Sequence, residues 1–317
     1  MNTYTNTAAQ TNEVKTNTAT HEVKINEAAL LVTLSIGIPP LVKTDKKATK
    51  QVEDTNRTDR NIGEFKKKLL TADTLDKINT LRGEARTYHY AKTLPWGDLG
   101  IRLLPNVYLI DYQNELRRLS SEFENLTKDF LTAYPAEVAQ AQLKLGDLFN
   151  EADYPPTAHL KDKFRFSVSF EPLPASGDFR VDIGATAAQE LKDMYANVIQ
   201  ERIGAAMKDV WERLLTPLKN LSLKLDYEEV EDKSGTGNHT TSKPKNGHFK
   251  GTIVTNVLEI VDVMKECNLM GDPKMEQVRI DLRKALTGVT YDGLKNSESL
   301  RILTKEKIDG IISNLGW

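Results

Sequence analysis

The chain has 317 residues, of which 39% are hydrophobic and 28% charged, and its formal net charge is -2. This composition provides a core for one or two domains, and the near-zero charge argues against a global basic field that recruits nucleic acid. The single cysteine, Cys267, excludes an internal disulfide framework and is typical of a reducing cytosol. No apolar run approaches the roughly 20 residues of a membrane span, and no secretory signal pattern is present. We therefore expect a cytoplasmic chain.

The first quarter of the chain predicts a tail, a strand and three helical pieces. Residues 1–25 are polar and predict a disordered tail, because they bury too little apolar surface to offset the ordering entropy. The β-branched run Ala29–Ile36 predicts a strand. Helical patterns follow at Lys46–Glu53, Ile62–Leu70 and Leu75–Tyr90. We interpret the adjacent basic residues 66–68 as a solvated helix face.

The next segment predicts an ordered loop followed by a long helix. Pro and Gly punctuate Thr93–Pro105, which favours a loop. From Asn106 to Ala133, apolar residues recur at alternating steps of three and four, which is a coiled-coil a/d seam. The seam consists of Leu109, Tyr112, Leu116, Leu119, Phe123, Leu126 and Phe130. Pro135 predicts an interruption, with a further helix over Ala136–Leu148.

Two alternating segments and a second long helix follow. Phe164–Glu171 and Phe179–Ile183 alternate apolar and polar residues, so we expect them to form a three-stranded sheet with the first strand. A second helix is expected over Ala187–Glu229, with a kink at Pro217. The Gly-, Ser- and Thr-rich residues 233–250 predict a flexible linker.

A smaller helical region completes the chain. Helices are predicted at Ile253–Cys267, at Pro273–Leu286 with Asp272 as N-cap, and at Ser299–Leu303 and Lys305–Leu315. The predicted fold class is mainly α with a small β element. It has a long antiparallel, coiled-coil-like hairpin of the two long helices, a β-hairpin or small sheet, and a C-terminal helical region. The expected domains are a tail 1–25, a hairpin domain 26–232, a linker 233–250 and a C-terminal region 251–317.

No motif of the sequence predicts catalysis, a cofactor or a metal. Gly235-Thr-Gly237 lacks the Gly-Lys of a phosphate loop and no strand–turn–helix pattern surrounds it. The five histidines have no partner at metal-ligand spacing. Cys267 lies beside Met264 in an amphipathic pattern, which favours a buried thiol over a nucleophile. We therefore predict no catalytic, cofactor-binding or metal-binding residues.

One cluster of aromatic and charged residues is a candidate pocket or partner contact. Its members are Tyr88, His89, Tyr90, Trp96, Asp98 and Arg102. Trp and Arg dominate protein interfaces, which favours a functional interpretation. The alternative is an anchored loop, in which Trp96 is buried for packing and Asp98 pairs with Arg102. We favour the anchored loop, because buried aromatic residues usually serve packing, and we assign His89 no role in proton transfer.

A series of short motifs resembles a large family of uncharacterised proteins from tailed phages and proteobacteria. In chain order the motifs are Glu84-Ala85-Arg86, Tyr88-His89-Tyr90, Thr93–Asp98, Arg102–Pro105, Leu145–Phe149, Asp153-Tyr154-Pro155, Phe164-x-Phe166, Pro172-x-Pro174, Asp178–Val181, Trp211-x-Arg213-Leu214, Asn268-Leu269 and Asp272-Pro273. They span nearly the whole chain after the first two dozen residues. The chain departs from the family at Ile38-Pro39-Pro40, where a Trp usually follows the first strand.

The resemblance implies a context without an assigned activity. Members occur in phage genomes, some near genes for MoxR-type AAA+ ATPases or von Willebrand A-like proteins. The leading hypothesis is therefore a non-enzymatic phage accessory protein that binds protein partners or itself through a helical hairpin, including an adaptor role for an AAA+ ATPase. A nucleic-acid-binding or DNA-end-protecting protein is the first alternative, and an enzyme with a site near His89 and Trp96 is the second. A positive stripe would favour nucleic acid, a pocket at His89 an enzyme, and an exposed apolar helix stripe a protein partner.

Overall fold

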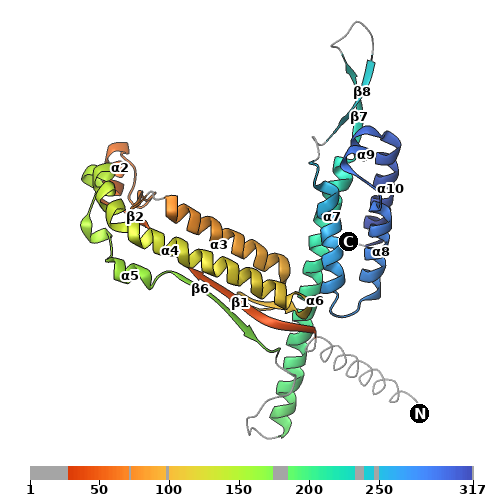
Figure 1. The fold of residues 1–317 in the computed structure, drawn as a ribbon, viewed down its shortest axis with the longest axis horizontal. Coiled ribbons are helices and arrows are strands. Elements are labelled where there is room, and N and C mark those ends of the chain that lie inside the picture. Colours follow the sequence, from red (N-terminus) through yellow and green to blue (C-terminus); the bar gives the residue numbers. More distant parts are fainter. Residues whose placement is uncertain are drawn as a thin grey trace. The chain divides into compact units, whose positions relative to one another are not determined.

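The computed structural model describes residues 28–70, 73–97, 100–173, 185–232, 239–245 and 250–315. The chain divides into two compact units. Unit 1 comprises Met1–Leu31, Leu94–Val107 and Pro172–Trp317, and unit 2 comprises Val32–Thr93 and Tyr108–Glu171. Each unit is mainly helical, which confirms the predicted class of an α-rich chain with a small β element and a C-terminal helical region (Figure 1).

Unit 2 is built on two long helices. The helices of this unit are α2 (Lys46–Asn56), α3 (Asp73–Lys92), α4 (Leu109–Leu145) and α5 (Thr157–Lys161). Helices α3 and α4 pair in antiparallel fashion, since Glu84 pairs with Arg118 and the later His89 contacts the earlier Tyr112. Within unit 2 the helical partner of α4 is α3, whereas the sequence predicted the other long helix, α6, which belongs to unit 1. The a/d seam indicates which face of a helix is buried, but many apolar faces can cover it.

The a/d seam of α4 forms the core of unit 2. Tyr112, Leu116, Leu119, Phe123 and Phe130 are buried, as the seam predicts. The predicted interruption is wrong, because α4 continues through Pro135 to Leu145. Buried residues on both sides of the proline, Tyr134 and Ala141, hold the helix in place, and the Tyr134 hydroxyl donates a hydrogen bond to the Pro155 carbonyl. Packing can thus offset the backbone hydrogen bond that proline cannot donate.

A four-stranded sheet has the order β4-β5-β1-β6, with strands β1 (Ala29–Gly37), β4 (Leu94–Pro95), β5 (Ile101–Pro105) and β6 (Arg165–Glu171). Strands β1 and β6 confirm two of the three predicted strands, and the third, Phe179–Ile183, lies outside the described residues. The segment Thr93–Pro105, predicted as a loop, instead contains β4 and β5. These two strands form an antiparallel pair in which Leu94 lies opposite Leu103.

A second, two-stranded sheet in unit 2 replaces a predicted helix. Ile62–Leu70 was expected to be helical, but β3 (Lys66–Lys68) pairs antiparallel with β2 (Val42–Thr44), and Lys43 lies opposite Lys67. The three lysines are therefore not a solvated helix face. The side chain of Lys67 is only 5% exposed, whereas that of Lys66 is 61% exposed. Alternation along the strand turns the middle lysine inward.

Unit 1 is built on α6 (Ala185–Lys224) and four C-terminal helices: α7 (Ile253–Cys267), α8 (Pro273–Leu286), α9 (Tyr291–Asn296) and α10 (Glu298–Asn314). Helix α6 packs against α7 and α10, and Cys267 is buried, as predicted. Helix α6 ends five residues before the predicted Glu229. The bounds of α7 and α8 are as predicted, and the Asp272 side chain accepts a hydrogen bond from the Lys274 amide as the N-cap.

The predicted linker contains a strand. Strand β8 (His239–Pro244) pairs antiparallel with β7 (Tyr227–Asp232), so that the segment after α6 forms a β-hairpin. The helix α6 belongs to unit 1 together with the C-terminal helices, and α4 belongs to unit 2. None of the described helices combines the length and the apolar composition that crossing a membrane requires.

Candidate functional site

The predicted cluster of aromatic and charged residues is divided between the two units. Tyr88, His89 and Tyr90 lie in the last turns of α3 in unit 2, where His89 is 4% exposed. The His89 Nδ1 and the Tyr112 hydroxyl of α4 share a hydrogen bond of 2.7 Å. The Tyr88 ring stacks on Tyr112 at 6.0 Å. These contacts join the end of α3 to the start of α4.

The surroundings of His89 are those of a packed helix end. The Thr93 hydroxyl donates a hydrogen bond of 2.6 Å to the His89 carbonyl, and the Tyr112 ring meets Phe170 of β6 edge-on at 6.1 Å. Burial raises the pKa of Tyr88, and the negative charges of Glu115 and Asp111 raise it further. The phenol is therefore neutral at neutral pH.

The remaining members of the predicted cluster belong to unit 1. Trp96 is 3% exposed and follows β4, which packs against α6. Burial of the ring is as the sequence predicts. A side chain at Gly97 would approach the guanidinium of Arg202 on α6. Arg102 is half-buried on β5, opposite Pro95. Asp98 lies outside the described residues, and so does its predicted ion pair with Arg102.

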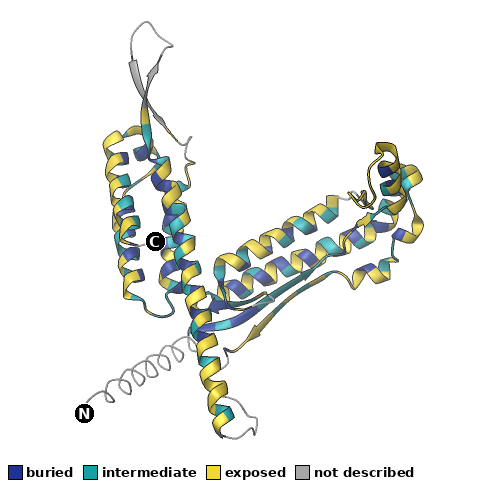
Figure 2. Ribbon diagram, turned by 180° about the vertical axis from the view of Figure 1, so that it is seen from behind, coloured by how far each residue is buried: buried dark blue, intermediate teal, exposed yellow. Residues whose placement is uncertain are grey.

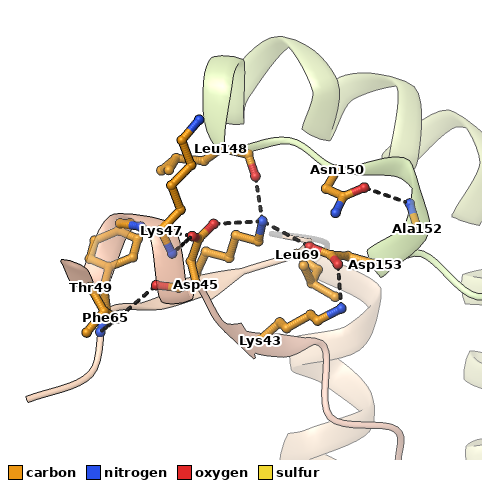
Figure 3. A network of polar contacts seen from close by, with 12 residues as sticks. Lys43, Asp45, Lys47, Thr49, Phe65, Leu69, Leu148, Asn150, Ala152 and Asp153 are labelled. Carbon is orange, nitrogen blue, oxygen red and sulfur yellow. Dashed lines mark hydrogen bonds and ion pairs between the residues drawn. The ribbon is translucent and has the colours of Figure 1, made fainter. Parts of the chain in front are cut away.

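A buried ionic network, which the sequence did not predict, lies at one end of unit 2. The ammonium of Lys67 lies 3.0 Å from the Asp45 carboxylate and 2.9 Å from the Asp153 carboxylate, and it donates a hydrogen bond of 2.6 Å to the Leu148 carbonyl. Asp153, with a side chain only 3% exposed, also pairs with Lys43. Figure 3 shows these groups converging from the two-stranded sheet, from α2 and from the segment after α4.

The network holds its charges in their ionised forms. Hydrogen bonds from Lys43 and Lys67 lower the pKa of Asp153 despite its burial. The pKa of Asp45 is lowered first by the backbone amide of Ala48, for which Asp45 is the N-cap, and then by Lys67. Burial lowers the pKa of Lys67, but its two carboxylate partners outweigh this effect and raise it. Each buried charge is paired, so the network fastens β2, β3 and α2 to the end of α4.

The charged residues of this network are far apart in the sequence. Lys43 and Asp153 are separated by 110 positions, and no local pattern indicates their contact. One usable signal was the Lys66–Lys68 run directly before the apolar Leu69 and Leu70, which also fits a short strand with one lysine turned inward. In the described ranges, no three His, Cys, Asp or Glu side chains are grouped as metal ligands.

An apolar groove runs between α4 and β6 in unit 2. Its volume is about 810 Å³, and its apolar lining consists of Phe123 and Leu131 of α4, Phe164 directly before β6, and Phe166 of β6. The Phe123 ring lies 5.6 Å from the Phe166 ring and 6.3 Å from the Phe164 ring. Phe123 itself is buried, whereas Phe164 and Phe166 are half-buried and remain accessible.

The polar lining of the groove is mainly cationic. Lys128, Lys161 and Arg165 line it together with a single acidic residue, Glu124. Thr127 also lines it, and the buried Thr127 hydroxyl has no hydrogen-bond partner among the described residues. This arrangement can hold an apolar group between positive charges. The alternation of aromatic and polar residues predicted this strand but not that Phe164 and Phe166 remain accessible.

A second accessible apolar surface lies on α6 in unit 1. The buried seam of this helix, which includes Ile199, Ile203 and Val210, continues toward the helix start through Tyr195 and Leu191. There the side chains become accessible: Leu191 is 36% exposed and Met194 64% exposed. We call Leu191, Met194, Tyr195 and Val198 the α6 stripe. Figure 2 shows this end of α6 as largely exposed.

Comparison with known proteins gives one match. Residues 52–225 match the model of a family described as a protein of unknown function. This range contains α3, α4, β6 and α6, and hence both the groove and the α6 stripe. The chain matches no curated protein and no solved structure.

Proposed function

The chain belongs to the family "Protein of unknown function (DUF3150)", whose model covers more than half of its length, and from this premise we propose that it is a protein-binding accessory protein. Its partner binds through the exposed helical surface of α6. The proposed biological setting is a phage or proteobacterial cytoplasm, in which the chain acts as an adaptor for an AAA+ ATPase of the MoxR type.

The α6 stripe is the observation that supports this proposal. Leu191, Met194 and Val198 recur at steps of three and four, which is the spacing of a helix–helix contact. Each of them is more than one third exposed. Leu191 also lies in one row with Tyr195 and the buried Ile199, at steps of four. An exposed row of apolar side chains on a helix is typical of a surface that receives another helix.

The proposed AAA+ partner is supported by the resemblance of the motifs, not by the contacts of the structure. The resemblance implies that genes for similar chains occur near genes for MoxR-type ATPases in some genomes. Neighbouring genes often encode proteins that act together. An adaptor needs a surface that binds its partner, and it needs no reaction of its own. The exposed α6 stripe meets the first requirement.

The test is co-expression of the full chain with a MoxR-type ATPase encoded beside such a gene. Leu191→Glu with Met194→Glu places two charges on the α6 stripe and is expected to abolish co-purification. Asn197→Glu is the matched control, because Asn197 is exposed on the same helix but lies off the stripe. Circular dichroism of both variants checks that they are folded. Co-purification that survives the double substitution would contradict the proposed surface, and no complex with the unmodified chain would contradict the proposed partner.

A further inference from the structure

We propose that the groove between α4 and β6 binds an extended acidic segment of a partner protein, which adds a strand to the outer edge of β6, the edge with which no described strand pairs. This surface lies in unit 2 and does not depend on the α6 stripe. It goes beyond the proposed function because it identifies a second docking site and the chemistry of its occupant.

Strand β6 lies at the edge of the four-stranded sheet, where a partner strand can be added. Strand β6 pairs with β1 on one side, and no described strand pairs with its other side. The strand runs along the outer side of β1 beneath α4 (Figure 1). A free edge offers a row of main-chain N–H and C=O groups, and extended peptides bind such edges by strand addition. The seven residues of β6 are long enough for this pairing.

The lining of the groove places it at this outer edge. Arg165 points to the opposite face of the strand from Phe164 and Phe166, yet all three line the groove. The groove therefore meets the edge of the strand at its first residues, Arg165 and Phe166. On α4, Thr127 and Leu131 lie on the side of the helix opposite Arg118, the residue that pairs with α3, since successive residues turn by about 100°. The groove thus opens on the side of α4 away from α3.

The charges of the groove select the occupant. Three cationic side chains and one carboxylate line it, so the local charge is positive although the whole chain is slightly acidic. An added strand would direct alternate side chains toward Leu131 and the two half-buried phenyl rings. Its other side chains would lie near Lys161 and Arg165, where carboxylates are favoured. The groove is therefore complementary to a segment that alternates apolar and acidic residues.

Single-stranded nucleic acid is the main rival, because aromatic and basic side chains also form stacking platforms. Here the phenyl rings already pack on one another. Phe164 lies 5.5 Å from Phe130 and 6.3 Å from Phe123, at steep interplanar angles that are typical of a core. These rings offer edges more than free faces to a ligand. Base stacking does not use the main-chain groups of a strand edge, whereas an extended peptide pairs with them. The outer edge of β6 therefore favours a peptide.

The test is selection of a random-sequence peptide display library on the full chain. We expect enrichment of peptides that alternate apolar and acidic residues. A synthetic peptide from this pool should bind Arg165→Glu and Lys161→Glu about fivefold to tenfold more weakly, since each reversal replaces a surface attraction with a repulsion. Lys163→Glu is the matched control, because this exposed lysine does not line the groove. The affinity of this variant for the peptide should remain unchanged.

Hydrogen exchange provides the second readout. The selected peptide should slow exchange of the main-chain amides of β6, and a version of the peptide N-methylated at alternate residues should lose binding. No enrichment of acidic peptides, or equal affinity for all three charge-reversal variants, would overturn the proposal. Binding of an oligothymidylate that is lost in Arg165→Glu but not in Lys163→Glu would also overturn it, in favour of nucleic acid. Loss of ATPase co-purification in the α6 variant alone leaves this proposal unaffected.

Discussion

Lys67 shows how a single residue can organise one end of a unit. Its ammonium contacts carboxylates from two separate segments and a main-chain carbonyl, while its side chain is almost fully buried. Taking these charges out of water is costly, and their mutual attraction offsets the cost only while each partner is present. The network is therefore sensitive to the loss of any one member.

The first prediction concerns the pH dependence of this network. The pKa of Asp153 is lowered in the folded chain, so the unfolded chain binds a proton first as the pH falls. The stabilisation of the folded chain by the Asp153 carboxylate is complete above the ordinary carboxyl pKa of 3.8. It is lost as the pH falls through the lowered pKa that Asp153 has in the folded chain. Asp153→Asn should reduce the free energy of unfolding at neutral pH by about 3 kcal/mol, the lower end for a broken buried pair, because Lys67 keeps Asp45.

Urea denaturation at several pH values checks this prediction. The unmodified chain should lose more stability on acidification than Asp153→Asn, because the variant lacks the carboxylate that titrates. Equal losses for the two proteins would show that Asp153 is not the group responsible.

The second prediction concerns Phe123, which is 2% exposed and contacts Phe164 and Phe166. Phe123→Ala should lower the free energy of unfolding by about 3–5 kcal/mol, the usual range for truncation of a buried phenylalanine. Leu143→Ala on the same helix is the control, since Leu143 is 86% exposed and its truncation should change stability by less than about 0.5 kcal/mol. Similar melting temperatures for the two variants would exclude Phe123 from the core.

Among the elements, the sequence predicted those whose formation depends on local signals. Helices α7 and α8 have strong periodicity and, for α8, an Asp cap followed by proline, and their bounds were predicted correctly. Strand β1 was predicted from its β-branched run. In these segments the local preference and the tertiary environment agree.

The elements that sequence analysis missed depend on distant contacts. Strand β3 is a lysine-rich segment whose middle residue is buried against distant partners, namely Asp45, Asp153 and the Leu148 carbonyl. Strand β4 has two residues and exists through its pairing with β5. The pairing of α4 with α3, and the groove beside β6, follow from which faces meet in space. No periodicity within one segment contains that information.

The third prediction concerns Pro135, which lies inside α4 and cannot donate a hydrogen bond to the Leu131 carbonyl. Pro135 is exposed, so its replacement creates no cavity. Pro135→Ala should raise the free energy of unfolding by about 1–2 kcal/mol, because the restored helix bond exceeds the entropy that the unfolded chain regains. A urea midpoint that falls would show that the proline fits a helix distortion that alanine does not.

At the scale of the whole molecule, the tryptophan residues are unevenly distributed between the two units. All three tryptophans fall in the ranges assigned to unit 1, whereas the Lys67 network and the Phe123 core lie in unit 2. Tryptophan emission therefore reports on one unit only, and far-UV circular dichroism reports on both.

The fourth prediction uses this distribution. Asp153→Asn should shift the urea transition followed by circular dichroism while the midpoint followed by tryptophan emission stays unchanged, because all partners of Asp153 in the network belong to unit 2. Coincident shifts of both signals would show instead that the two units unfold as one cooperative structure.

The β1–β6 pairing also affects how the chain is made. The Ser167 hydroxyl donates a hydrogen bond to the Ser35 carbonyl across 132 positions. At about 5–20 residues per second, roughly 7–26 s of ribosomal synthesis separate the two residues. During that interval one edge of an apolar strand has no partner. A nascent chain in this state is a natural substrate for a chaperone, so its yield should depend on the speed of translation.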